Sequence, residues 1–202
     1  MGRREEKAKK QRAAITAAAV SVFSKKGFHR ASVEEIARKA GVGKGTIYLY
    51  FDDKSRLFAA AVAEGIENII RELKVTLELD LRFPLHLKKL MERNVELYLE
   101  YGDLTKIFTN ELSSGLEKKV RAEIEAVREH YIEFLADTLK YGHERGYLRQ
   151  IDFRLAAIAM LGTLDSLCNH TLKNRDVDRD KLLETVYALL MTGLVAEDKV
   201  KR

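Results

Sequence analysis

The chain is poor in three residue types: it has one cysteine, one proline and no tryptophan among 202 residues. A single thiol, Cys168, forms no intramolecular disulfide and no cysteine-based zinc site. No uncharged run exceeds twelve residues, whereas a membrane-spanning helix needs about 20. The scarcity of turn residues favours an all-α fold, and 46% hydrophobic with 33% charged residues indicates a globular chain. The lone thiol and the short apolar runs favour a cytoplasmic location.

Apolar residues recur at spacings of three and four through most of the chain, which is the pattern of amphipathic helices. Glycines such as Gly41, Gly115 and Gly146 separate these stretches. Over residues 152–173 the apolar positions surround most of the helix, as in a helix that is buried or packed against another subunit. The sequence predicts about nine helices, over residues 5–26, 33–40, 44–51, 54–79, 84–101, 104–113, 117–144, 152–173 and 180–196.

Positive charge gathers at the N-terminal end. The net charge is +5, yet residues 1–60 alone carry 14 Lys or Arg against 6 Asp or Glu, a net charge of +8. The remainder carries −3. Residues 1–60, called the head below, are basic, and the rest of the chain is mildly acidic. This distribution indicates that the head alone binds a polyanion, with nucleic acid as the first candidate. Chance clustering of solvated lysines is the simpler alternative.

Two short helices joined by a glycine-bounded turn form the most informative stretch, residues 32–54. Ser32 followed by Glu35 is the pattern of a capping box that begins the first helix, and Gly41 ends it. Two such helices predict a helix-turn-helix, in which the second helix enters the major groove of DNA with its N-terminal residues leading.

The second helix of this pair carries groups that suit nucleic acid. Lys44 places a cation at its start, and Gly45 lets the backbone approach a partner closely. Thr46 and Tyr48 offer hydroxyls that suit phosphate oxygens. For Tyr48 and Tyr50, ordinary half-buried packing is the alternative.

With its flanking residues, this stretch resembles the N-terminal domain of the TetR family of transcriptional regulators. The resemblance covers about residues 10–60 and rests on Gly27-Phe28, residues 31–37 and 40–51, Lys54 and Leu57 in that order. The rest of the chain matches only in the number and length of its helices. The resemblance implies an all-α protein, with a helix-turn-helix DNA-binding domain in residues 1–53 and a larger helical effector-binding and dimerisation domain in residues 54–202.

Carried onto this sequence, the resemblance implies a set of DNA contacts. Lys44 and Tyr50 are the candidates for base edges. The candidates for phosphates are Ser32, Thr46, Tyr48 and Lys54. Position 34 often contributes a basic or polar contact in the family, but here it is Glu34, so that contact is left open. The implied DNA-binding residues are Ser32, Lys44, Gly45, Thr46, Tyr48, Tyr50 and Lys54.

The resemblance also implies a homodimer joined by the last two helices of each chain in a four-helix bundle. A dimer presents two recognition helices to half-sites about 34–36 Å apart on a palindromic operator. A monomer that buries both helices internally is the alternative. The expected interface residues are Leu155, Ile158, Gly162, Leu167, Tyr187 and Met191.

An effector pocket in the helices after Lys54 is the remaining implication. A mostly hydrophobic effector, such as a fatty-acyl group or an aromatic compound, would release a repressor from its operator; an activator or an effector-free DNA-binding protein stays open. Every lining position is also one that a plain core would use. The candidates are Ile66, Ile70, Leu97, Tyr98, Tyr101, Phe108, Tyr131, Phe134 and Met160.

Two rival classes find little support in the residues. None of the five histidines has Glu three positions before it, as a di-iron site in a helical bundle requires, and no His-x-x-x-His pair is present. The first helix has mostly alanine opposite its basic residues, which is a weak membrane anchor. The sequence therefore predicts neither an enzyme nor a membrane-surface protein, and it predicts no metal or cofactor.

Overall fold

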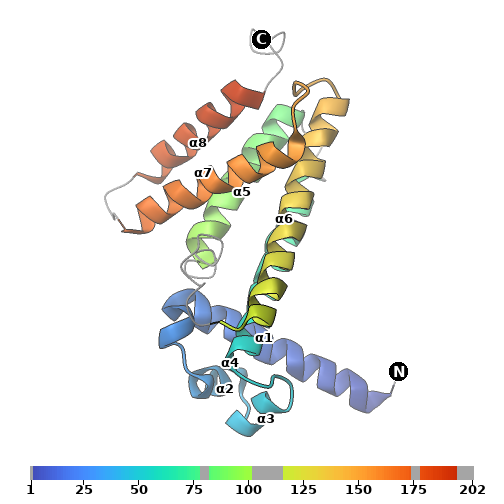
Figure 1. The fold of residues 1–202 in the computed structure, drawn as a ribbon, viewed down its shortest axis with the longest axis vertical. Coiled ribbons are helices and arrows are strands. Elements are labelled where there is room, and N and C mark those ends of the chain that lie inside the picture. Colours follow the sequence, from blue (N-terminus) through green and yellow to red (C-terminus); the bar gives the residue numbers. More distant parts are fainter. Residues whose placement is uncertain (1, 78–81, 102–115, 174–177, 195–202) are drawn as a thin grey trace. The chain divides into compact units, whose positions relative to one another are not determined.

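The computed structural model describes residues 2–77, 82–101, 116–173 and 178–194. Within these ranges the chain forms eight α-helices and no β-strand (Figure 1). The helix expected over residues 104–113 lies outside the described residues. None of the helices described is both long enough and apolar enough to cross a membrane. The chain packs as two units: Met1–Asn68 with Tyr101–Val127, and Ile69–Glu100 with Arg128–Arg202.

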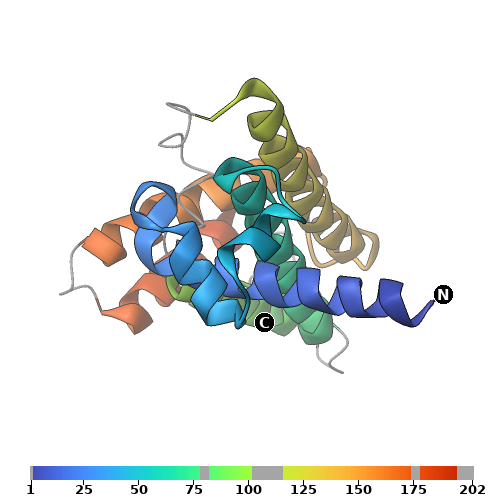
Figure 2. The same cartoon turned by 90° about the horizontal axis from the view of Figure 1, so that it is seen from below.

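The first unit holds helices α1 (Arg3–Arg30), α2 (Val33–Ala40) and α3 (Lys44–Tyr48), with the first part of α4 (Lys54–Leu77). Helix α2 packs against α1, and α3 packs against α2 (Figure 2). Fully buried apolar side chains from each of these helices form the core of this unit, because each helix has one apolar face. They include Ile15, Phe23, Ile36, Ile47, Leu57 and Phe58.

Local signals set the ends of the short helices. The hydroxyl of Ser32 accepts a hydrogen bond from the Glu35 amide at 3.2 Å and so caps α2. Gly41 ends α2 at φ 67°, in the left-handed region that favours glycine. The second half of the expected capping box is absent, because the Glu35 carboxylate pairs instead with Lys26 at 2.8 Å.

The two helix ends near Gly27 and Phe51 compare differently with the sequence expectation. The backbone of Gly27 is not helical (φ 73°, ψ 173°), so α1 (Arg3–Arg30) consists of two helical segments that meet in a kink at the residue where the first helix was expected to end. Helix α3 ends at Tyr48 rather than at Phe51. Short-range turns follow α3, in which the amides of Tyr50 and Phe51 both bond to the Ile47 carbonyl at 3.0 Å. Glycine therefore ends the first helical segment of α1, and the recognition helix is only five residues long.

The second unit holds α5 (Phe83–Tyr101), α7 (Phe153–Lys173) and α8 (Arg179–Leu194), with the later parts of α4 and of α6 (Lys118–Glu144). Helices α7 and α8 run side by side (Figure 1). Their buried core with α5 gathers Val95, Tyr98, Leu164, Cys168, Leu182 and Val186. Because α4 and α6 each contribute residues to both units, each is a continuous helical link between the residues of one unit and those of the other.

Candidate nucleic-acid interface and ligand cavity

The start of α3 lies at the surface of the helix-turn-helix. Gly43 caps α3, and Lys44 is its first residue. Gly43, Lys44 and Gly45 are all exposed, and a Cβ placed on Gly45 would meet no other atom within 4 Å. An open, basic helix start of this kind can approach a flat polyanion without steric hindrance.

The cation at this start is not isolated. The Lys44 ammonium donates a hydrogen bond to the Glu34 carboxylate in the first turn of α2. This hydrogen bond holds the pKa of Glu34 below its ordinary value and raises the pKa of Lys44. Both groups therefore stay charged at neutral pH.

The remaining candidates for DNA contact divide into exposed and internally engaged residues. Tyr48 is 44% exposed, and Ser32 is exposed while capping α2. Thr46 is half-buried. The Tyr50 hydroxyl is half-buried and donates to the Gln11 side-chain oxygen at 2.9 Å. Its expected role at a base edge therefore requires this hydrogen bond to be exchanged.

Lys54, at the start of α4, is tied to the end of α1. Its ammonium donates to the His29 carbonyl at 3.3 Å and lies 4.6 Å from the centre of the Phe28 ring. Partial burial lowers the pKa of this ammonium. The side chain thus fastens α4 to α1 within the first unit, and a phosphate contact would add to this role.

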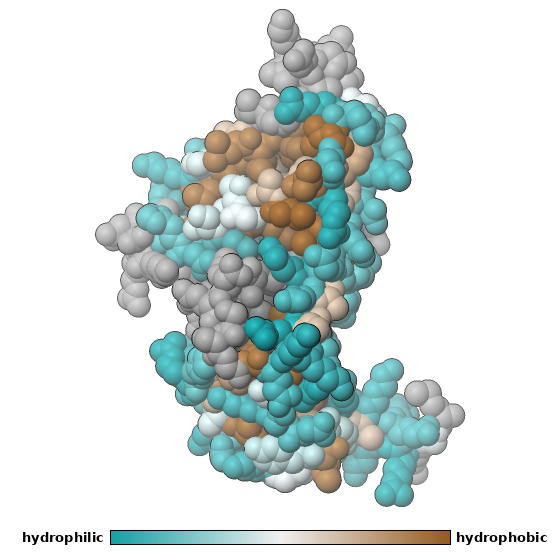
Figure 3. Space-filling model, in the orientation of Figure 1, coloured by the Kyte–Doolittle hydropathy of each residue, from teal (hydrophilic) through white to brown (hydrophobic). Residues whose placement is uncertain are grey.

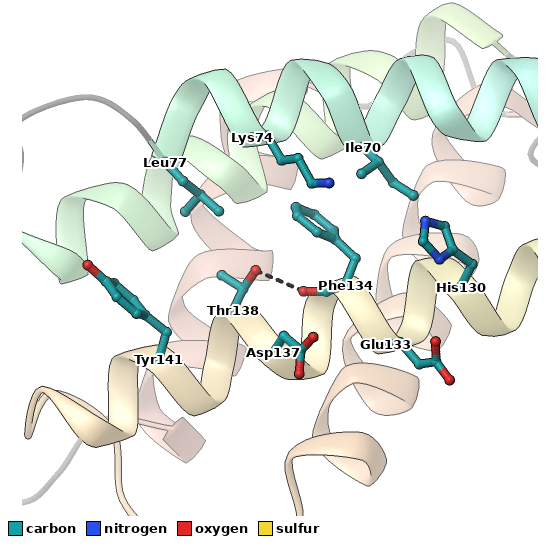
Figure 4. Close-up of a pocket in the computed structure, with 9 residues that line it drawn as sticks. All are labelled: Ile70, Lys74, Leu77, His130, Glu133, Phe134, Asp137, Thr138 and Tyr141. Atoms are coloured by element: carbon teal, nitrogen blue, oxygen red, sulfur yellow. Dashed lines mark hydrogen bonds between the residues drawn. The ribbon is translucent and has the colours of Figure 1, made fainter.

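The second unit contains a cavity of about 480 Å³ between α4 and α6. This volume lies in the range of small-molecule sites, about 300–1,000 Å³. Ile70 and Leu77 from α4 and Phe134 from α6 supply apolar walls. Figure 4 shows Lys74 and His130 directed into the space between the helices, and Glu133 directed away from α4. The full lining is Ile70, Lys74, Leu77, His130, Glu133, Phe134, Asp137, Thr138 and Tyr141.

The structure brings only part of the predicted effector set to this cavity. Ile70 and Phe134 line it. The side chain of Tyr101 and the whole of Phe108 lie outside the described residues. The others are buried in packed core: Ile66, Leu97, Tyr98, Tyr131 and Met160. Lys74 and His130 were not predicted from the sequence, because single polar residues on long helices look like ordinary solvated positions, and both are exposed.

A buried polar network crosses the core of the second unit, between α5, α6 and α7. Asp165 is 5% exposed and accepts a hydrogen bond from the Tyr98 hydroxyl, and Arg128 interacts with it electrostatically. Burial raises the pKa of Asp165 to about 6, against the lowering effects of Tyr98 and Arg128. Asn169 donates to the Tyr98 hydroxyl oxygen at 3.3 Å. The side chains of Asn94 and Tyr131 form a second buried hydrogen bond nearby.

The thiol of Cys168 belongs to the same core. It is fully buried, and burial raises its pKa to about 12, with the nearby Asp165 adding to the effect. A thiol with such a pKa is almost entirely protonated at neutral pH and therefore unreactive.

An apolar surface covers the outer side of α7 and α8 (Figure 3). Leu155 is 63% exposed and Leu189 is 61% exposed. Among the predicted interface residues, Gly162 is exposed as well, and a Cβ on it would meet no other atom within 4 Å. The half-buried ones are Ile158, Leu167, Tyr187 and Met191, of which Leu167 packs partly against the core below. Among the residues described, no group of three or more His, Cys, Asp or Glu side chains is placed to hold a metal ion.

Comparison with known proteins matches both parts of the chain. Residues 15–61 match the model of bacterial regulatory proteins of the tetR family. Residues 86–194 match the model of a tetracyclin repressor-like C-terminal domain. The two matches together cover more than half of the chain.

Individual relatives agree over nearly the whole length. The fatty acid metabolism regulator protein of Bacillus subtilis is 28% identical over 89% of this chain and 93% of its own. The fatty acid degradation regulator FadR of Bacillus halodurans is 30% identical, with a TM-score of 0.74 over 90% of this chain and 94% of its own. The structure of FadR from Bacillus subtilis in complex with stearoyl-CoA is 27% identical, with a TM-score of 0.74 over 90% and 98%.

These matches agree with the all-helical fold. Regulators of this family bind operator DNA as dimers and respond to small ligands. The chain belongs to the TetR family of bacterial regulatory proteins, and it is a transcriptional regulator with an N-terminal helix-turn-helix and a C-terminal ligand-binding domain.

Proposed function

We propose that this chain is a homodimeric repressor that is released from a palindromic operator by a fatty acyl thioester or a similar acyl-bearing anion. The observation that carries the proposal is the similarity, over nine-tenths of the chain, to a fatty acid regulator whose structure holds stearoyl-CoA. The protein acts by binding and not by catalysis. We place it in the cytoplasm, where operator DNA is accessible and the single thiol stays reduced.

The cavity between α4 and α6 supports this ligand class. Its apolar walls, Ile70, Leu77 and Phe134, suit an acyl chain. The Lys74 ammonium and the His130 ring face the same space (Figure 4), and a cation with a hydrogen-bonding ring suits an anionic or strongly polar head. Glu133 and Asp137 also line the cavity, so its polar side chains carry both signs of charge. An amphipathic ligand whose head reaches Lys74 and His130 therefore fits the cavity better than a neutral hydrocarbon does.

Helix continuity supplies the route from cavity to DNA. Helix α4 begins at Lys54 beside the helix-turn-helix and reaches Ile70, Lys74 and Leu77 in the cavity wall. An effector that binds one arrangement of α4 and α6 more tightly than another increases the fraction of molecules in that arrangement. The position of the helix-turn-helix carried by α4 changes with it. A 100-fold change in DNA affinity needs about 2.7 kcal/mol of differential binding. About 100 Å² of additional apolar burial supplies that amount.

The test begins with selection of DNA fragments by the purified protein, with sequencing and a count of protomers per bound site. We expect a palindrome bound by two protomers or a multiple of two, with an affinity that falls steeply with salt because phosphates are neutralised. Long-chain acyl-CoA should then release the DNA, whereas free CoA should not. Selection without a motif, or release by free CoA alone, would contradict the proposal.

A pair of variants ties the response to the cavity. Lys74→Gln should weaken release by acyl-CoA while operator affinity stays the same, because Lys74 faces the cavity. Lys140→Gln removes the same charge from an exposed position of α6 and serves as the control. Equal responses of the two variants would place the ligand elsewhere.

A further inference from the structure

The ion pair between Glu34 and Lys44 joins the two helices of the helix-turn-helix at the surface. Glu34 lies in the first turn of α2, and Lys44 is the first residue of α3. Both side chains are about half exposed, at 59% and 50%. The pair therefore lies on the surface where the leading residues of a recognition helix meet base edges.

A carboxylate is an unusual group to hold at a DNA-facing surface. The DNA phosphates repel a carboxylate, and contacts to phosphates supply most of the affinity for DNA of any sequence. On the edges of the bases, the partner that suits a carboxylate is the N4 amino group of cytosine, and the partner that suits lysine is the O6 and N7 edge of guanine. A Glu and a Lys held in contact thus match the two halves of a G·C pair.

We propose that Glu34 is a specificity-determining residue that reads a G·C pair in each half-site together with Lys44. This inference rests on the proposed binding of the operator. On DNA of any other sequence the two side chains remain paired with each other. Lys44 is then withheld from the phosphates, and sequence-independent binding is weakened. On the operator the pair opens onto the cytosine N4 group and the guanine edge.

The simpler role for Glu34 is local, because an acid in the first turn stabilises a helix through the helix dipole. Glu35 lies in the same turn and provides an internal comparison. Its carboxylate pairs with Lys26 of α1 rather than with α3. Glu34→Gln and Glu35→Gln therefore change the net charge and the first turn of α2 equally, but only Glu34→Gln frees Lys44.

The experiment compares the full-length parent, Glu34→Gln and Glu35→Gln. Each protein selects its sites from random duplex DNA, and each is titrated at several salt concentrations against one scrambled duplex of fixed length. Thermal melting establishes that the variants are folded. For Glu34→Gln we expect about tenfold tighter binding to the scrambled duplex. The salt slope should steepen by about 0.9 for each protomer that gains a phosphate contact, and the G·C preference at one position of each half-site should be lost.

Two outcomes would overturn the inference. If Glu34→Gln and Glu35→Gln show the same scrambled-duplex affinity and the same salt slope, the effect is net charge alone and Glu34 has no special role. If Glu34→Gln selects the same motif as the parent, Glu34 reads no base. If the parent protein itself selects no motif, the proposed function is overturned together with this inference. If the parent selects a motif but Glu34→Gln selects the same one, only this inference fails.

Discussion

Both units carry ion pairs at the surface, but the ligand-binding unit also buries polar side chains in its core. In the helix-turn-helix, the charged pairs lie at the surface: Glu34 with Lys44, and Lys26 with Glu35. In the ligand-binding unit, Asp165 and the Asn94–Tyr131 hydrogen bond are buried in the core. Exposed pairs rearrange at little cost in free energy, whereas buried polar groups are costly to disturb. The head can therefore exchange partners on DNA, while the polar core of the second unit fixes its packing.

The largest expected effect comes from the apolar face of α7 and α8. Leu155→Asp would place a charge inside each half of a symmetric interface, where an unpaired buried charge costs about 3–5 kcal/mol. We expect the dimer to dissociate at micromolar concentration and operator binding to be lost. Sedimentation at several concentrations measures this. Leu85→Asp makes the same change at an exposed leucine of α5, and it should leave the dimer intact. Two intact dimers would exclude this face as the interface.

The second prediction concerns the buried carboxylate of Asp165. Its pKa of about 6 in the folded chain exceeds the ordinary 3.8, so the folded state binds this proton more tightly than the unfolded state. This contribution to stability is fully present below pH 3.8 and is lost as the pH rises to about 6. The loss amounts to about 3 kcal/mol.

Asp165→Asn should remove this loss, so that the variant is more stable than the parent at pH 7 and its unfolding free energy is flatter between pH 4 and 6. Urea titrations at stepped pH values measure the difference. Asp180→Asn, at an exposed position of α8, should behave like the parent. If the stability of the parent relative to Asp165→Asn does not fall as the pH rises through this window, the prediction for Asp165 is contradicted.

The third prediction concerns Lys44 itself. Lys44→Ala removes a charged contact worth about 1–3 kcal/mol, and we expect operator affinity to fall about tenfold or more with no change in melting temperature, since the side chain is exposed. Lys39→Ala removes a charge from an exposed position of α2 and should weaken operator binding less. Equal losses would mean that only net charge matters.

The smallest effect is expected at Tyr48. Tyr48→Phe removes one exposed hydroxyl and should weaken operator binding by about 1 kcal/mol, the worth of a typical hydrogen bond. Fluorescence anisotropy with a labelled operator resolves a change of this size. Parent-like affinity would show that the ring packs on the DNA or on the protein without using its hydroxyl.

Local signals made the head predictable. Helix α2 begins after Ser32 and ends before Gly41, as the sequence predicted, because helix capping depends on residues that are neighbours in the chain. The early end of α3 was not predictable in this way, since residues 49–51 follow the helical pattern and yet form turns. The partner of Glu35 was equally hidden, because Lys26 lies nine residues away on another helix.

The second unit was predictable as helices but not as a cavity. Periodicity identifies the apolar face of α4 and of α6, and Ile70 and Phe134 were found in this way. It does not tell which faces pack tightly and which leave a gap, so Leu97 and Met160 looked equivalent to them although both are buried in the core. Lys74 and His130 become informative only once two helices face each other.

The buried thiol of Cys168 has a practical consequence for spectroscopy. Because it is the only cysteine in the chain and lies fully inside the core with a pKa near 12, maleimide and methanethiosulfonate reagents should leave it unmodified in the folded protein. A cysteine introduced at an exposed position of the head, such as Lys39→Cys, would then carry the sole label. In the dimer, two such labels report the separation of the heads directly, with and without acyl-CoA, and no native residue needs to be removed first.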